Sequence, residues 1–268
     1  VTKLLGELYT NYYHNLYEKD LMQPMAKALN YLNYDYWNLG NHDFNYGPDM
    51  IHQYINDVNA TLLTGNAYEH GSPMGCEYAI HHFDDSHAIA LIGVVTQYIP
   101  VWEKAEHIQD NTFEDAFDYV KCTVEKIKAT EDVQGICVVY HGGHELHLET
   151  NEPTELLTGE NLASKMCNEI DGIDVLIAGH QHRSYAAFVN GVATVQPYEN
   201  AKNLGVIEWD LDTNERTVEL LMADQEVDEE LLNLIGPEEQ RAQDWLDKPL
   251  GRLKEGDLLI HDPIDARI

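Results

Sequence analysis

Short apolar runs alternate with segments of helical periodicity through the first two thirds of the chain. Five of these runs have strand length and are too continuous for a strand with one face in solvent, so they predict buried strands. They are YDYWNL (34–39), ATLLT (60–64), HAIALIGVV (87–95), GICVVY (135–140) and DVLIA (174–178). The segments between them predict helices, and this alternation indicates an α/β layered domain.

Two of the expected helices have the clearest pattern. The first covers residues 111–129, where Asn111 and Thr112 form the start, acidic residues follow, and apolar side chains recur at steps of three and four. These apolar residues are Phe113, Phe117, Val120, Val124 and Ile127. The second covers residues 159–170 and repeats the pattern with Leu162, Met166 and Ile170.

At about residue 184, the alternation of buried strands and helices gives way to a pattern that predicts antiparallel strands. The stretch AAFV-Asn190-Gly191-VATV predicts a hairpin with a two-residue turn, and GVIEWDL predicts a further strand. Residues 228–247 predict an acidic amphipathic helix that is broken near Gly236 and Pro237. The segment after it, PLGRLKEGDLLIHDPIDARI, resembles the opening of a further unit.

Composition narrows the possible partners. The 268 residues suffice for one large domain with a sizeable core, and no stretch has the apolar length of a membrane span. With 47 acidic and 16 basic residues, the chain lacks the clustered Lys and Arg that bind a nucleic acid polymer. The four cysteines show no CxxC spacing, which argues against a disulfide framework and favours a cytoplasmic location.

Three of the predicted buried strands run into similar sequences. The first ends in GNH (40–42), the fourth in HGGH (141–144) and the fifth in GHQH (179–182). The ends of strands are where α/β sheets hold ligands, and glycine permits tight turns and close backbone approach there. We therefore expect these three segments to converge.

The residue types in these segments suit a metal centre. Imidazole nitrogens with an amide oxygen and carboxylates make a mixed shell typical of Mn, Fe, Co or Zn. A His-x-His pair on an extended turn points its rings in different directions, which favours two adjacent ions. A single GNH is typical of a simple turn as well. His144 and His147 could be ligands by spacing, but we interpret them as residues that support the loop.

The combination of GNHDFNYG, VVYHGGHE and IAGHQHRS resembles the calcineurin-like metallophosphoesterase superfamily, in its bifunctional 5'-nucleotidase and 2',3'-cyclic-nucleotide phosphodiesterase branch. Supporting segments are GVVTQYIPVWE (93–103), residues 157–182 and DWLDKPLGRL (244–253), so the resemblance covers nearly the whole chain. It implies an α/β fold in the form of a four-layer α/β/β/α sandwich of two mixed sheets.

The resemblance also implies roles for individual residues. Asn41, His141 and His180 would bind one divalent ion, and His182 would contribute to a second. His42 would be the catalytic histidine that stabilises the phosphoryl oxygens and helps the leaving group depart. Two such ions, which could be Mn, Zn, Fe or Co, would activate a water molecule and bind the oxygens of the phosphoryl group during an in-line transfer. The expected substrate is a small phosphorylated molecule, most naturally a nucleotide.

The sequence departs from the family pattern in several places. The Asp-x-His and Gly-Asp motifs that supply the bridging carboxylate are missing, and Asn45 occupies the position of an acidic partner of His42. We expect residues 1–226 to be a metal domain without its first motifs, and residues 227–268 to be a linker helix with the start of an incomplete nucleotidase domain. The alternatives are a phosphoesterase for another small ester and a degenerate fold that binds metal without turnover. A chain without these motifs could also be inactive alone.

Overall fold

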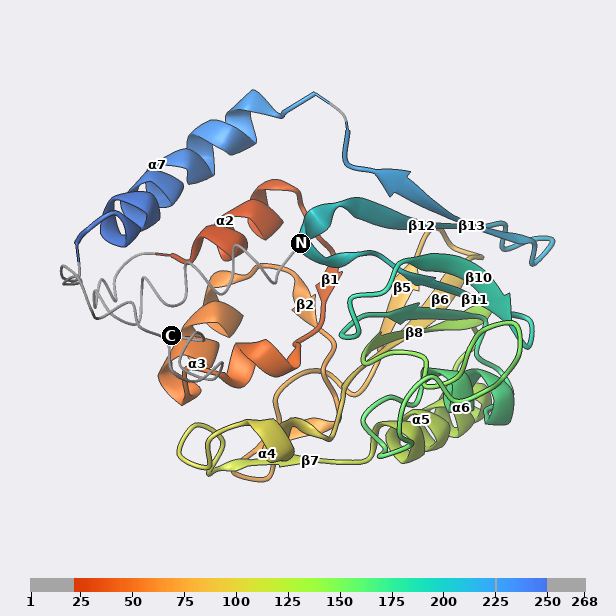
Figure 1. The fold of residues 1–268 in the computed structure, drawn as a ribbon. Coiled ribbons are helices and arrows are strands. Elements are labelled where there is room, and N and C mark those ends of the chain that lie inside the picture. The colour runs from red at the N-terminus through yellow and green to blue at the C-terminus, as the bar shows by residue number, and fades with distance from the viewer. Residues whose placement is uncertain (1–21, 225, 250–268) are drawn as a thin grey trace.

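A six-stranded mixed sheet with the strand order β10-β11-β9-β8-β6-β5 is the largest sheet of the described residues and lies in the right-hand half of Figure 1. The computed structural model describes residues 22–224 and 226–249. Four neighbouring strands of this sheet run parallel, and β5 and β10 add antiparallel edges. The strands are β5 (Ala79–His82), β6 (Ala88–Val95), β8 (Gly135–His141), β9 (Val175–Ala178), β10 (Tyr185–Val189) and β11 (Val192–Gln196).

Smaller sheets and the helices make up the rest of the described fold. The remaining strands pair as β1 with β2, as β4-β3-β7, and as β12 with β13. They are β1 (Tyr36–Trp37), β2 (Thr61–Leu62), β3 (Ala67–Glu69), β4 (Ser72–Pro73), β7 (Asn111–Phe113), β12 (Asn203–Trp209) and β13 (Arg216–Met222). The helices are α2 (Pro24–Tyr31), α3 (Pro48–Asp57), α4 (Ile99–Trp102), α5 (Ala116–Thr130), α6 (Ala163–Glu169) and α7 (Glu229–Leu246), with 3-10 turns η1 (Asn41–Phe44) and η2 (Glu199–Ala201).

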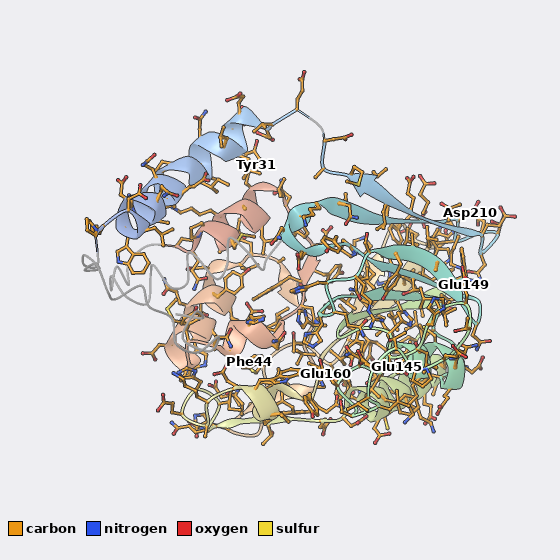
Figure 2. The ribbon with its side chains drawn as sticks, in the orientation of Figure 1. Tyr31, Phe44, Glu145, Glu149, Glu160 and Asp210 are labelled. Carbon is orange, nitrogen blue, oxygen red and sulfur yellow. The ribbon has the colours of Figure 1, made fainter. Side chains whose placement is uncertain are left out.

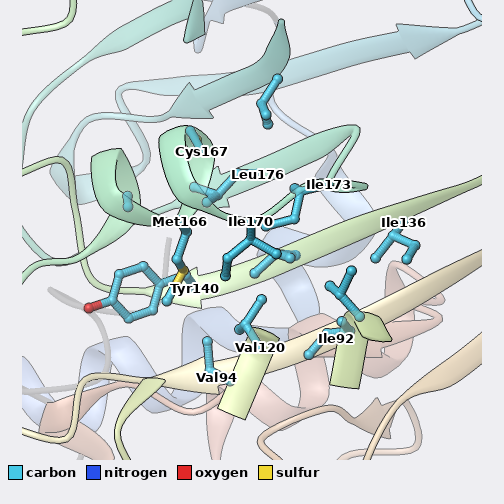
Figure 3. Packing of buried hydrophobic residues seen from close by; sticks show 14 of the residues in the cluster. Ile92, Val94, Val120, Ile136, Tyr140, Met166, Cys167, Ile170, Ile173 and Leu176 are labelled. Carbon is cyan, nitrogen blue, oxygen red and sulfur yellow. The ribbon is translucent and has the colours of Figure 1, made fainter. Parts of the chain in front are cut away.

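The six-stranded sheet is covered on both faces, which explains its continuous apolar strands. Helices α5 and α6 lie under one face, where Ile92, Val120 and Met166 pack together (Figures 1 and 3). The β12–β13 hairpin lies over the other face. Along β8, Tyr140 packs in the helix-side core while Cys137 packs against the hairpin. This arrangement confirms the predicted α/β sandwich.

Most of the strands predicted from apolar runs are present. Residues 87–95, 135–140 and 174–178 correspond to β6, β8 and β9, and the hairpin turn places Asn190 and Gly191 at positive φ, 49° and 83°. The runs at 34–39 and 60–64 pair over only two residues each. Beyond that pairing, the Leu39 N–H donates to the Thr64 hydroxyl at 2.8 Å, so a side chain replaces the strand ladder.

Both predicted helix starts were wrong. Residues 111–113 form β7 and pair with β3, and α5 begins after Asp115, whose carboxylate accepts the Asp118 N–H at 3.0 Å. Helix α6 covers only Ala163–Glu169. Its cap comes from the distant Glu145, whose carboxylate accepts the N–H groups of Ser164 and Lys165 at 3.0 and 2.8 Å.

The predicted break in the last helix was also wrong, because α7 continues through Pro237. Proline removes one N–H from the helix ladder, and the preceding Gly236 has no Cβ to meet the ring. Helix α7 packs beside α2, which supports it (Figure 1). Between the two helices, Lys27 Nζ lies 2.8 Å from Oε1 of the buried Glu238. The boundary at residues 226 and 227 stays a prediction, and residues 250–268 lie outside the described part.

Across residues 22–224 and 226–249, no helix combines the length and the apolar character that crossing a bilayer requires.

Candidate metal centre

Asn41 projects from a tight turn in which Gly40 provides essential space. The Gly40 N–H donates to Asp43 Oδ2 at 2.7 Å, which closes the turn around Asn41. A Cβ on Gly40 would lie 2.6 Å from Cε1 of His141 and 2.9 Å from each of its ring nitrogens. The φ of Gly40, −113°, suits any residue, so glycine is required here for space. Burial raises the pKa of Asp43 to about 6, and the Gly40 N–H acts in the opposite direction.

Three of the predicted ligands meet, two from the carboxyl ends of β8 and β9 and one from the η1 turn that follows β1. Asn41 Oδ1 lies 2.9 Å from His141 Nε2 and 3.1 Å from His180 Nδ1, and the two imidazole centroids are 5.4 Å apart. His141 is the last residue of β8, and His180 follows two residues after β9. Because β8 and β9 are parallel neighbours, their ends bring the two rings to one side of Asn41.

Glu160 orients His180. The Glu160 carboxylate lies 2.9 Å from His180 Nε2 and accepts its proton, so Nδ1, which lies 3.1 Å from Asn41 Oδ1, is the ring nitrogen that could bind a cation. Carboxylate–histidine pairs of this kind commonly accompany metal-bound imidazoles. In the view of Figure 2, Glu160 lies between Phe44 of η1 and Glu145 of the loop after β8.

His42 is held by the residue that replaces the expected acid. Its Nδ1 lies 2.6 Å from Asn45 Oδ1. Asp43, the next acidic residue along the chain, instead accepts the Gly40 N–H. The amide of Asn45 therefore contacts the ring of His42 in place of the acidic partner that the resemblance led us to expect.

His182 is directed to a different partner. Its Nδ1 lies 2.5 Å from Glu199 Oε2, and its side chain is 39% exposed. The turn is not extended as expected, because His180 and His182 both have positive φ, 69° and 55°. Backbone strain of this kind is often kept at functional sites. The two rings serve separate partners, and the assignment of His182 to a second ion stays a prediction.

His144 lies in the loop after β8, and its side chain is buried. Its ring is buried between the hydroxyls of Ser164 and Thr194, at 2.9 and 3.2 Å. Burial and the charge of Arg183 lower its pKa to about 4. Its carbonyl accepts the Gln181 amide at 3.0 Å, which ties the loop after β8 to the loop that carries His180.

The cluster supplies part of a metal shell. Among the residues that the structure describes, no group of three or more His, Cys, Asp and Glu side chains is arranged to hold an ion. The cluster offers two imidazoles and one amide oxygen, which fit the mixed shell of a divalent transition metal, so further donors would complete it. No local pattern could identify Glu160, because its partner His180 lies 20 residues away.

Most of the chain is similar to known proteins. The profile of the calcineurin-like phosphoesterase family matches residues 4–184. The trifunctional nucleotide phosphoesterase YfkN of Bacillus subtilis is 26% identical over 85% of this chain and 17% of its own length. The 2',3'-cyclic-nucleotide 2'-phosphodiesterase/3'-nucleotidase of Salmonella typhimurium is 22% identical over 86% of this chain and 40% of its own length.

A solved structure is similar over almost the whole chain. It is a Staphylococcus aureus protein provisionally named a 5'-nucleotidase, with a TM-score of 0.79 and 33% identity. The match covers 97% of this chain and 51% of that protein. The chain thus spans about half the length of this relative and less of the two curated ones.

Proposed function

Because the chain belongs to the calcineurin-like phosphoesterase family, we propose that it takes part in the metal-dependent hydrolysis of phosphate esters, with nucleotides as its substrates. Members of this family generally use divalent metal ions. The substrate class is supported by relatives named for nucleotide and cyclic-nucleotide chemistry.

One observation carries the proposal, which is the convergence of one amide oxygen and two imidazole nitrogens, the atom types that bind divalent transition metals. Asn41 Oδ1 faces His141 Nε2 and His180 Nδ1, at 2.9 and 3.1 Å. These side chains would hold a divalent ion, with Glu160 keeping His180 in the tautomer that offers Nδ1. When bound, such an ion polarises phosphate oxygens and acidifies water.

His42 performs the proton chemistry beside this centre. It follows Asn41 directly in η1, and its Nδ1 is held by Asn45 at 2.6 Å. A histidine in this position stabilises charge on a phosphoryl oxygen and gives a proton to the leaving-group oxygen. The ring of Trp102 lies 5.3 Å from that of His180 and covers one side of this ligand.

The finer assignments belong to the same proposal. We assign His182 to a second ion, because its ring faces Glu199 rather than the three-residue cluster. The ions are Mn, Zn, Fe or Co, the types that imidazole and oxygen ligands suit. A cytoplasmic location remains part of the proposal, on the basis of cysteine usage.

A substrate panel tests the proposed function. The protein would be incubated with Mn²⁺ and with 5'-AMP, 3'-AMP, 2',3'-cyclic AMP, bis(p-nitrophenyl) phosphate and glucose 6-phosphate, each with and without EDTA. We expect hydrolysis of at least one nucleotide that stops when EDTA removes the metal. Turnover of only the sugar phosphate would refute the nucleotide substrate, and metal binding without any turnover would establish the non-catalytic alternative.

A further inference from the structure

A chain of polar contacts leads from His42 to a buried carboxylate in a distant part of the sequence. Beyond the His42–Asn45 contact, Asn45 Nδ2 donates to Glu103 Oε2 at 2.5 Å. Glu103 caps the C-terminal end of α4, 58 residues from Asn45 along the chain, and its side chain is only 7% exposed. From these contacts we propose that Glu103 is a positioning residue that fixes His42 through the amide of Asn45. This inference rests on the role of His42 in the proposed function.

The direction of the hydrogen bonds carries the argument. A carboxylate only accepts, so Glu103 must face the NH₂ group of Asn45. The amide then presents Oδ1 to His42, and this atom can only accept as well. His42 Nδ1 must therefore carry a proton, and Nε2 becomes the atom that takes up or releases a proton at the substrate. Glu103 selects this tautomer of His42 without touching its ring.

The position of Glu103 is itself fixed. Its Oε1 accepts the Lys104 N–H and a proton from His107 Nδ1, both at 2.8 Å, which leaves Oε2 for Asn45. The residue before it, Trp102, stacks beside the ring of His180. One short segment after β6 therefore orients the catalytic histidine and covers a proposed metal ligand.

The substitution Glu103→Gln gives the sharpest test. Its single oxygen would stay where Lys104 and His107 donate, so its NH₂ group would face the NH₂ group of Asn45. To avoid this clash, the amide of Asn45 would turn over and present Nδ2 to His42, which would move the ring proton to Nε2. The matched control is Glu106→Gln, since Glu106 is 76% exposed and its carboxylate lies 3.9 Å from His107.

Long-range ¹H–¹⁵N NMR spectra of the imidazole nitrogens would identify the His42 tautomer, in protein without metal and with diamagnetic Zn²⁺. We expect Nδ1–H in the parent and in Glu106→Gln, and Nε2–H in Glu103→Gln. The kcat of Glu103→Gln should fall at least about tenfold, with unchanged metal content and Tm. An Nδ1–H tautomer in Glu103→Gln would overturn the inference even if the protein hydrolysed none of the tested substrates, because this readout does not depend on turnover.

The same substitution made in an Asn45→Asp protein distinguishes an effect of Glu103 through Asn45 from a general structural role of Glu103. The substitution Asn45→Asp places a carboxylate directly against His42, but it also puts two carboxylates side by side. In that background, Glu103→Gln removes a repulsion and should leave kcat unchanged or raise it. A tenfold loss of kcat in both backgrounds would show that Glu103 acts independently of Asn45, and would overturn the inference.

Discussion

Replacing Gly40 with alanine tests the packing that brings His141 to Asn41. The added Cβ would lie 2.6 Å from His141 Cε1. Carbon atoms in contact normally lie roughly 3.5–4.0 Å apart, so the ring or the turn must move by about 1 Å. Because ligand distances in metal sites hold within about 0.2 Å, this displacement removes His141 from the ligand set.

We expect the affinity for Mn²⁺ to fall by at least about 10- to 100-fold, which is about 1.4–2.7 kcal/mol. The fold should persist, because the φ of Gly40 is one that alanine adopts readily. Isothermal titration of metal-free protein measures the affinity, and circular dichroism checks the fold.

The matched control is Gly179→Ala, which approaches the same histidine from the other loop. Its Cβ would lie 3.6 Å from His141 Nδ1, an ordinary contact, so affinity should stay near that of the parent. The steric argument is refuted if Gly40→Ala binds Mn²⁺ as tightly as the parent, or if both alanine variants lose affinity equally.

The other predictions concern the histidines. His180→Ala should lose metal. The stabilisation of about 2.7 kcal/mol that Mn²⁺ at 100 times its Kd gives the parent should therefore be absent from its melting curves. His42→Ala should keep its metal and lose turnover, while substitution of the exposed His147 by alanine should leave both metal binding and turnover unchanged. Equal metal loss from His180→Ala and His42→Ala would contradict this division of roles. The buried His144 has a pKa of about 4, below the value of roughly 6.5 for an unfolded chain, so its contribution to stability is complete above about pH 6.5 and declines by about 3 kcal/mol as the pH falls to 4. Urea unfolding would measure the unfolding free energies of the parent and of His144→Gln at pH 7 and at pH 4. The difference between the two proteins should change by about 3 kcal/mol between these pH values, and a difference that stays constant would contradict the assigned pKa of His144.

The pattern of apolar and turn residues correctly predicted the elements whose structure depends on neighbouring residues in the sequence. The strands at 87–95, 135–140 and 174–178 are buried on both faces, so their apolar runs are continuous, and Asn190-Gly191 has the positive φ that a tight hairpin turn needs. The same pattern predicted the wrong helix starts where a contact with a residue far away in the sequence determines the start. Glu145 caps α6 from outside that helix, and pairing with β3 draws residues 111–113 into a strand.

The same limit applies to the candidate site. Asn41, His141 and His180 could be selected because each follows an apolar run, and parallel strands bring such ends together. Glu160 and Glu103 could not, because each belongs to the site only through a contact with a residue 20 or 58 positions away. The roles of the candidate residues, the domain boundary at 226 and the cytoplasmic location stay predictions.

The position of the bound metal tests the central claim most directly. Anomalous diffraction from crystals of the protein grown with Mn²⁺ would locate the ion. We predict a peak in contact with Asn41 Oδ1, His141 Nε2 and His180 Nδ1, at ligand distances of roughly 2.0–2.2 Å. No peak at these three side chains, or a peak only beside His182 and Glu199, would contradict the assignment of the metal centre.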